Sequence, residues 1–472
     1  MSETSKSTFT SSIRLKLREP ARLRNLELVL LVVAIGIMIS AMALVQLGAQ
    51  GVIDASVLLL TVVLGVLILG MHVTLRIVAP DADPLILPVI TVLNGLGVAM
   101  IYRIGLADDA AGWDNAGIRQ IAWTALAIGL AIGVLLVVRN HRVLLRYRYI
   151  AMFSGIVLLL LPMLPIIGVE KNGARLWLEL GPFSFQPGEL AKVALAIFFA
   201  GYLVSARDSL SMVGRKVLGM TFPRARDLGP ILVVFAASML VLVFQRDLGT
   251  ALLYFGLFLV MLYVATGRSS WIVLGLSLFL LGAFVASRTL SYVGGRVDAW
   301  LDPFNPDNFD AIGGSYQLVQ GLFGLADGGL IGTGLGQGRP DITPLAESDY
   351  IVSALGEELG LIGLFAILGL YLLFISRGFR IGFAGQDDFG RLLGVGLAFV
   401  IALQIFVVIG GVTRVIPLTG LTTPFLAAGG SSLVANWIIA ALLLRLSDSV
   451  RNQPRLVIDP RAEAENRLVV GQ

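Results

Sequence analysis

The chain has 472 residues, of which 57% are hydrophobic and 14% are charged, and its formal net charge is +4 at pH 7. Because soluble domains are about one quarter charged, this composition excludes an ordinary soluble protein and indicates a polytopic membrane protein. Cysteine is absent, which excludes disulfides and thiolate sites, and two histidines, His72 and His141, leave little for a zinc site. No basic tract interleaved with aromatic residues indicates a nucleic-acid partner.

The first 25 residues are polar and basic, and the apolar run 26–47 that follows is too long for a signal-peptide core. We therefore interpret this run as a retained membrane span. A bilayer-spanning helix needs about 20 apolar residues. The sequence predicts an all-α polytopic membrane protein with about 12 spans: 27–48, 57–79, 84–104, 118–138, 149–168, 189–206, 228–245, 249–266, 270–288, 350–375, 392–412 and 425–447.

One boundary is ambiguous, because the triplet Gln245-Arg246-Asp247 interrupts an apolar stretch that runs from 228 to 266. Two short spans joined by a polar hinge fit this stretch better than one very long span, and a re-entrant pair is the alternative. Lys and Arg cluster in alternate loops, on the same side as the basic N-terminus. Since cytoplasmic loops are rich in Lys and Arg, both termini are predicted to be cytoplasmic. The segments then expected outside are 169–188, 289–349 and 413–424.

Segment 289–349 is too long for a simple connector, and it is rich in Gly and in acidic residues. Two interpretations stay open: a flexible, solvated loop, or a loop whose apolar residues return to the membrane and pack. The last outer segment carries Pro417, Gly420, Pro424, Gly429 and Gly430. A helix broken here is expected to line a cavity, and a kink or a close helix crossing is the alternative.

Charged residues inside spans are costly and are usually functional. Glu189 and Lys192 lie three residues apart and therefore share one helix face. Arg246 and Asp247 lie at the hinge, and Glu357 and Glu358 lie about two turns into the tenth span. Together these charges would line an outward-facing polar cavity, whereas snorkelling of the lysine and internal pairing of the glutamates are the structural alternatives.

Seven short motifs resemble the SEDS family of bacterial cell-wall proteins (RodA, FtsW and SpoVE). They are NGARLW (172–177), FQPGELAK (185–192), QRDLGT (245–250), GSYQ (314–317), ESDYI (347–351), GEELG (356–360) and PLTG…GGSS (417–432). The chain departs from the family at Gly188, Arg246, Ala428 and Glu347-Ser348, where Ser, Pro, Tyr and His-Thr are usual. The sequence of residues 343–352 looks closest to that of RodA-like proteins of actinobacteria.

The family has ten spans, and its first span corresponds to 84–104 here. The resemblance therefore divides the chain into a cytoplasmic N-terminus (1–25), two extra helices (26–80), a ten-helix core (81–448) and a cytoplasmic tail (449–472). It implies a peptidoglycan glycosyltransferase in a bacterial cytoplasmic membrane, which polymerises lipid II at the outer face for elongation and releases undecaprenyl diphosphate. The implied partner is a class B penicillin-binding protein, a transpeptidase, within an elongation or division complex. A division-specific polymerase, a lipid II flippase and a non-catalytic scaffold remain alternatives.

In the family pattern, an acidic residue at the spacing of Asp310 from GSYQ is implicated in catalysis, so Asp310 is predicted as the base, with Asp302 as the alternative. Lys192 is expected near this carboxylate. A diphosphate leaving group needs cationic stabilisation, for which Arg175, Lys192, Arg246 and Arg296 are available. No cofactor is certain, although carboxylates could hold a divalent cation such as Mg²⁺ or Mn²⁺. The predicted substrate-binding residues are Arg175, Trp177, Glu189, Lys192, Arg246, Gln317, Asp349, Glu357 and Ser431.

Overall fold

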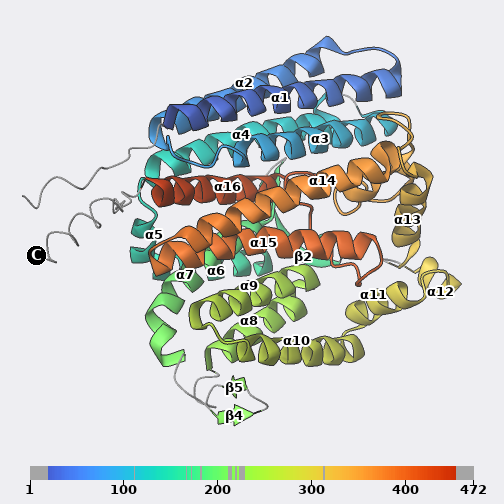
Figure 1. Cartoon of the computed structure of the whole chain (residues 1–472). Helices are drawn as coiled ribbons and strands as arrows, with labels where there is room; N and C mark the ends of the chain where they lie inside the picture. Colours follow the sequence, from blue (N-terminus) through green and yellow to red (C-terminus); the bar gives the residue numbers. More distant parts are fainter. Residues whose placement is uncertain are drawn as a thin grey trace, which may run out of the picture.

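The computed structural model describes residues 20–452, except 111, 166, 172, 181–182, 211–214, 218–219, 223–228 and 312–313. The basic residues expected at 1–19, at 224 and 226 and in the tail 453–472 lie outside the described residues. The described chain forms a bundle of long helices that run side by side (Figure 1).

Twelve apolar helices of the described chain fall on the twelve predicted spans, which confirms the all-α polytopic fold. Two of them are shorter than a typical span, α6 (Arg148–Leu160) and α8 (Gly229–Gln245). The other ten are long and apolar enough to cross a membrane: α1 (Pro20–Gln50), α2 (Ala55–Val78), α3 (Ile86–Ala107), α4 (Ala116–Val137), α7 (Pro187–Leu210), α9 (Leu248–Thr266), α10 (Ser270–Thr289), α14 (Ile351–Ala384), α15 (Asp388–Val412) and α16 (Gly430–Arg451).

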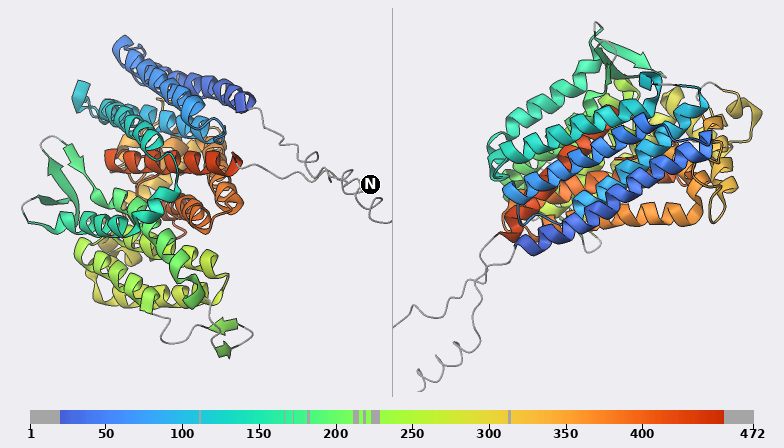
Figure 2. Two further views of the ribbon diagram at one scale, coloured as in Figure 1. Left: turned by 90° about the vertical axis from the view of Figure 1, so that its left-hand side faces the viewer. Right: turned by 90° about the horizontal axis from the view of Figure 1, so that it is seen from above.

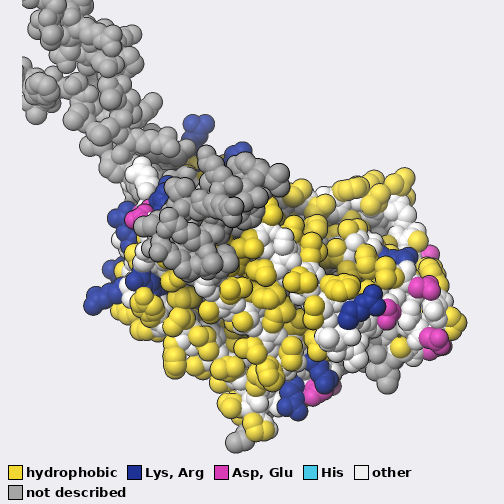
Figure 3. Space-filling model, turned by 90° about the horizontal axis from the view of Figure 1, so that it is seen from below, with side chains coloured by type: hydrophobic (Ala, Val, Ile, Leu, Met, Phe, Trp, Pro, Cys, Tyr) yellow, Lys and Arg dark blue, Asp and Glu magenta, His cyan; other side chains and the backbone are white. Residues whose placement is uncertain are grey.

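The first and last described residues lie at the same end of the bundle, which we call the termini end (Figures 1 and 2). The opposite end, the loop end, carries α11 (Ser291–Leu301), α12 (Pro306–Phe309) and α13 (Tyr316–Gly328). Helices α1 and α2 pack at one edge of the bundle against α3 and α4 (Figure 2). Hydrophobic side chains cover most of the face in Figure 3, as expected for a surface in contact with lipid.

The polar hinge is confirmed, because α8 ends at Gln245 and α9 begins at Leu248. Asp247 is the N-cap of α9, and its carboxylate accepts a hydrogen bond of 2.9 Å from the Thr250 amide. Arg246 adopts a left-handed backbone conformation with φ of 57°. These two residues therefore reverse the chain between two separate helices.

Three boundaries differ from the prediction. Helix α6 stops well before residue 168, because a 3₁₀ turn with Pro162 follows it, η2 (Leu161–Met163). Helix α14 continues beyond residue 375 to Ala384, with a kink at Gly360, where φ is 68°. Helix α16 begins only at Gly430, after an irregular segment that contains Pro424. The break expected in the last outer segment is thus present.

Segment 169–188 forms an antiparallel sheet that the sequence analysis did not predict, with strands β1 (Gly168–Lys171), β2 (Ala174–Leu180) and β3 (Phe183–Phe185) in that order. In β2, Arg175, Trp177 and Glu179 alternate with leucines, which is the period-two pattern of a strand with two different faces. A second, two-stranded sheet consists of β4 (Arg215–Val217) and β5 (Met220–Phe222).

Segment 289–349 is folded rather than a flexible loop, within its described residues. Leu318 and Val319 of α13 are buried, whereas Phe323, Leu330 and Ile331 are exposed. Gly321 lies so close to α14 that an added Cβ would meet the Tyr350 ring at 2.5 Å. The packing interpretation therefore holds for the inner face of α13.

Candidate functional site

The loop end holds a group of charges that we call the Arg296 cluster, consisting of Arg296, Asp247 and Asp349. The Arg296 guanidinium donates a hydrogen bond of 3.0 Å to the Leu418 carbonyl, which joins α11 to the last outer segment. A Cβ added to Gly420 would lie 3.8 Å from two guanidinium nitrogens and 4.0 Å from an Asp349 carboxylate oxygen. The arginine and the aspartate therefore converge on Gly420, where φ of 77° favours glycine.

The surroundings of Asp349 oppose its ionisation. Burial raises the pKa of Asp349 to about 6, with the charges of Glu347 and Asp247 adding to the effect and that of Arg296 opposing it. Asp349 was predicted to bind substrate, and it lies beside a cation that can face an anionic ligand. A carboxyl group with a pKa near neutrality, next to an arginine, is typical of functional sites.

Lys192 and Glu189 form a buried ion pair of 2.6 Å in the first turns of α7, as their spacing predicts. The lysine ammonium also donates to the Gln404 side chain at 3.1 Å and to Asn436 at 3.0 Å. Lys192 is therefore fully engaged with α7, α15 and α16, and its described partners do not include Asp310. Nearby, the Ser431 hydroxyl accepts a hydrogen bond of 2.7 Å from the Gln186 amide, which fixes the start of α7 against α16.

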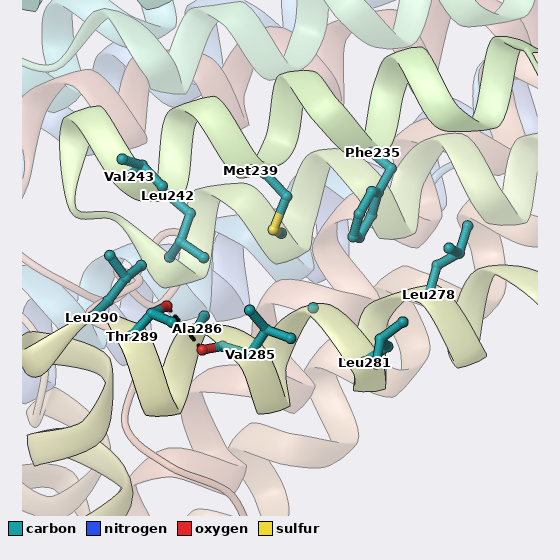
Figure 4. Close-up of a pocket in the computed structure, with 11 residues that line it drawn as sticks. Phe235, Met239, Leu242, Val243, Leu278, Leu281, Val285, Ala286, Thr289 and Leu290 are labelled. Atoms are coloured by element: carbon teal, nitrogen blue, oxygen red, sulfur yellow. Dashed lines mark hydrogen bonds between the residues drawn. The ribbon is translucent and has the colours of Figure 1, made fainter.

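An apolar groove of about 340 Å³ lies between α8 and α10 (Figure 4). The Thr289 hydroxyl donates to the Val285 carbonyl at 2.9 Å, so the wall presents no free polar group there. The lining residues are Phe235, Met239, Leu242, Val243, Leu278, Leu281, Gly282, Val285, Ala286, Thr289 and Leu290.

Tyr292 connects this groove to the Arg296 cluster. The Tyr292 hydroxyl donates a hydrogen bond to the carbonyl of Leu242, which lines the groove. Tyr292 precedes Arg296 by four residues in α11, so the two lie on the same helix face. Burial raises the pKa of Tyr292 to about 12, which keeps its hydroxyl protonated as a donor. The groove and the Arg296 cluster therefore lie on either side of Tyr292.

The sheet brings together three of the predicted site residues. Arg175 pairs with Glu170 at 3.2 Å, and Arg246 approaches the same carboxylate at 3.9 Å. Trp177 lies under the Lys171 ammonium, with 5.8 Å between the nitrogen and the ring centroid. Both arginines are largely exposed, so they form a cationic surface beside the hinge.

The two candidate bases lie apart from these buried groups. Asp302 directly follows α11 and Asp310 caps α12, and both are exposed. Within the described part of the chain, neither carboxylate has an ion-pair partner.

The position of this segment is set by hydrogen bonds between α11 and the last outer segment. The Trp300 indole donates to the Arg414 carbonyl at 3.1 Å, and the Arg414 guanidinium donates to the Trp300 carbonyl at 2.8 Å. Further along, the Gln317 amide donates to the Pro344 carbonyl at 2.7 Å, rather than facing the Arg296 cluster.

The two glutamates of α14 are engaged by backbone, which is the internal pairing that the sequence left open. The Glu357 carboxylate accepts from the Arg339 amide, and the Glu358 carboxylate accepts from the Gly336 amide at 2.7 Å. Arg103 of α3 lies 3.2 Å from Glu358. Substrate binding by Glu357 remains a prediction that this geometry does not favour.

Sequence reasoning missed Arg103, Gln404 and Asn436, although each is a polar residue in an apolar span and could have been found by that criterion. For a metal ion, the fit is poor: no three Asp, Glu or His side chains of the described residues gather closely enough to hold one.

Comparison with known proteins gives a consistent result. A family model described as "Cell cycle protein", for FtsW, RodA and SpoVE, matches residues 84–452. The chain is 45% identical over 436 residues to the peptidoglycan glycosyltransferase RodA of Mycobacterium tuberculosis, and the match covers 92% of each chain. It is 35% identical to stage V sporulation protein E of Bacillus subtilis over 61% of this chain and 76% of that protein.

Solved structures agree in fold. A chain from a peptidoglycan synthase complex that coordinates polymerization and crosslinking superimposes with a TM-score of 0.60 at 27% identity, covering 79% of this chain and 99% of its own. The rod shape determining protein RodA of Thermus thermophilus superimposes with a TM-score of 0.53 at 26% identity, covering 79% of this chain and 98% of its own.

Proposed function

Because this chain belongs to the FtsW, RodA and SpoVE family, we propose that it is a peptidoglycan glycosyltransferase that polymerises lipid II. The observation that carries this proposal is the 45% identity to mycobacterial RodA, a peptidoglycan glycosyltransferase, across 92% of both chains. The FtsW of Geobacter strain M18, by comparison, is 34% identical. This difference supports a role in elongation and cell shape rather than in division.

The Arg296 cluster and the apolar groove suit a lipid-linked diphosphate. Ligand pockets commonly measure about 300–1,000 Å³, and the groove of about 340 Å³ can hold one segment of a polyprenyl chain. The diphosphate would then lie near Arg296, at the end of the groove marked by Tyr292. A fixed cation at this point stabilises the negative charge that develops on the leaving diphosphate.

Asp310 is assigned as the general base, with Asp302 as the alternative. The 4-hydroxyl of the acceptor GlcNAc loses its proton to the carboxylate and attacks the anomeric carbon of the donor. The bond between that carbon and the diphosphate oxygen breaks, the configuration inverts and undecaprenyl diphosphate leaves. Arg175, Trp177 and Arg246 on the exposed surface beside the hinge would contact the sugar or phosphate groups of substrate.

The loop end is assigned to the outer face of the cytoplasmic membrane and both termini to the cytoplasm. Arg139, Arg142 and Arg146 lie in the short connection at the termini end, as expected for a cytoplasmic loop. The functional core would be 81–448, flanked by 1–25, by the two extra helices (26–80) and by the tail 449–472. A class B penicillin-binding protein is the proposed partner, because a similar chain forms part of a complex that couples polymerization to crosslinking.

The test is polymerisation of purified lipid II by the purified protein, with product length resolved on a gel. Asp310→Asn removes the base and keeps the shape, and it should lower the rate by roughly 10²–10⁴-fold. Asp307→Asn, in the short helix that Asp310 caps and also exposed, is the matched control and should retain the wild-type rate.

Two results would overturn these assignments. Loss of activity in Asp302→Asn with normal activity in Asp310→Asn would transfer the role of base to Asp302. Translocation of lipid II in vesicles by a wild-type protein that forms no polymer would replace the transferase with a flippase.

A further inference from the structure

Helices α1 and α2 precede the family-matched residues 84–452, so family membership assigns them no role. They pack against α3 and α4 along one edge of the bundle. At the loop end, however, α1 also touches a segment far away in sequence. This segment, residues 332–338, follows α13 and contains four glycines, and we call it the glycine turn.

The contact between α1 and the glycine turn is backbone against backbone. A Cβ added to Gly48 of α1 would lie 2.3 Å from the Leu335 carbonyl oxygen and 3.0 Å from the Gly336 Cα. A Cβ added to Gly336, whose φ is 82°, would lie 2.7 Å from the Val45 carbonyl oxygen. Two glycines therefore permit an approach that any side chain would prevent.

A hydrogen bond and an apolar contact reinforce this approach. The Gln337 side-chain amide donates to the Gly48 carbonyl at 3.1 Å. Leu335 packs against a small core formed by residues of α1, α2, α3 and α4, including Met42 and Val45. The glycine turn is thus attached to the extra helices by three of its residues.

The same turn is bound from the other side by the family core. The Gly336 amide donates to the Glu358 carboxylate at 2.7 Å, and the Thr333 amide donates to the Glu357 carbonyl at 2.9 Å. Arg103 of α3 donates to the Gly338 carbonyl at 2.6 Å. The turn is therefore held between α1 on one side and α3 and α14 on the other.

The glycine turn is continuous with the segment that carries the proposed base. Helix α13 ends at Gly328, shortly before the turn, and begins at Tyr316, six residues after Asp310. A helix of this length, 13 residues, is a rigid element of about 20 Å. Helix α13 therefore connects the glycine turn, along the chain, to the segment that carries Asp310.

Glycine-rich segments lose more conformational freedom on ordering than other segments, so they need partners to stay in one conformation. We infer that α1 is an intramolecular brace, in which Gly48 and Gln337 are positioning residues that hold the glycine turn, and through it α13 and the Asp310 segment, in the polymerising geometry. The catalytic part of this inference rests on the proposed function, whereas the contact itself does not.

The experiment uses the full-length chain with one introduced cysteine, Val45→Cys, because the natural sequence has none. Val45 is fully buried on α1, beneath the glycine turn. Gly48→Ala adds a methyl group that collides with the Leu335 carbonyl, and it should raise the rate of maleimide labelling at position 45 about tenfold by favouring local opening. Gly36→Ala is the matched control in the same helix, because its methyl group meets nothing within 4 Å and should leave the rate unchanged.

The second readout is polymerisation of lipid II. Gly48→Ala should lower kcat by up to roughly 10²-fold, the loss that a displacement of about 1 Å can cause, with KM close to wild type. Gly36→Ala should leave kcat unchanged. Gln337→Ala, which removes one hydrogen bond and adds no bulk, is the second variant and should show both effects in weaker form.

The outcomes separate the brace from the proposed function. Unchanged labelling in both Gly48→Ala and Gln337→Ala would overturn the brace. Faster labelling with an unchanged kcat would show that the contact exists but positions nothing for catalysis, and would overturn the positioning role. A wild-type protein that forms no polymer would refute the proposed function, while the labelling rates would still decide whether α1 holds the turn.

Discussion

At the termini end, Asp83 is bound by two arginines, Arg377 at 2.6 Å and Arg451 at 2.5 Å. At the loop end, Arg296 lies beside Asp349 and Asp247, but its guanidinium donates to the Leu418 backbone carbonyl, and Asp349 keeps a pKa of about 6. The Asp83 carboxylate is held by two short ion pairs, whereas among the described residues neither carboxylate of the Arg296 cluster has an ion-pair partner within 4 Å. Buried charge therefore occurs at both ends of the bundle, and the carboxylates without an ion-pair partner, near a groove, make the loop end the candidate site.

Further ion pairs at the termini end follow the same pattern as Asp83. Glu27 of α1 pairs with Arg24 at 2.7 Å and lies 2.6 Å from the His72 ring nitrogen of α2. The Arg24 guanidinium also donates to the Ala82 carbonyl, so the extra helices are tied to the start of the core. These groups hold helix ends together.

The largest expected effect is at the loop end. Arg296→Gln removes the cation proposed to face the leaving diphosphate, and polymerisation should fall by roughly 10²–10³-fold. Because the Arg296 charge lowers the pKa of Asp349, the same variant should also raise that pKa above about 6, so a pH dependence that arises from Asp349 should move to higher pH. Initial rates measured across pH provide both readouts.

Arg288→Gln is the control for this experiment. Arg288 is an exposed arginine at the loop end of α10, and its guanidinium lies over the Phe284 ring. Equal losses in the two variants would mean that any positive charge at the loop end serves, and the contrast between the two ends would lose its basis.

A second effect should fall on stability and not on chemistry. Asp83→Asn leaves two arginines without their shared carboxylate, and breaking such a buried pair costs about 3 kcal/mol. The apparent unfolding temperature in detergent should therefore drop, while the polymerisation rate per folded molecule stays near wild type. Asp108→Asn, at an exposed position, should change neither quantity. A normal unfolding temperature in Asp83→Asn would show that the termini-end pairs are not structural.

The smallest expected effect concerns the apolar groove. Gly282→Leu places a side chain against the Phe235 ring, which an added Cβ alone would approach to 2.9 Å, and so fills part of the groove. With full-length lipid II, kcat/KM should fall about tenfold, the loss that a blocked apolar pocket produces. A short-chain analogue should be affected less, because less of its chain needs the groove.

Gly129→Leu is the matched control for this substitution, since nothing lies within 4 Å of a Cβ at position 129. Equal losses for long-chain and short-chain substrates in Gly282→Leu would show that the polyprenyl chain does not bind in the groove.

Local sequence patterns predicted much of the fold and less of the site. Apolar runs located the spans, and the polar triplet at 245–247 located the hinge, because both signals depend only on neighbouring residues. The spacing of Glu189 and Lys192 predicted their ion pair for the same reason. The partners of Lys192 on α15 and α16 could not be predicted, since Gln404 and Asn436 are more than 200 residues away in sequence.

Two other features depend on contacts between distant segments and could be seen only in the tertiary structure. The glutamates of α14 were predicted to line a cavity, but the glycine-rich backbone packs on them and its amides donate hydrogen bonds to their carboxylates. The kink at Gly360 was equally invisible, because it arises where the Leu361 and Ile362 amides donate to the Gly329 and Leu330 carbonyls of another segment.

The two-residue link between α8 and α9 has a consequence for how the protein is made. Helix α8 has 17 residues and α9 has 19. The link between them, Arg246 and Asp247, is too short for the two helices to enter the bilayer far apart. The pair would therefore insert as a single helical hairpin whose tip carries a positive and a negative charge across the membrane. Asp247 caps α9 and accepts a hydrogen bond from the Thr250 amide, so its carboxylate has a partner within the hairpin itself. Insertion of the hairpin therefore does not have to wait for α11 or α14 to be synthesised.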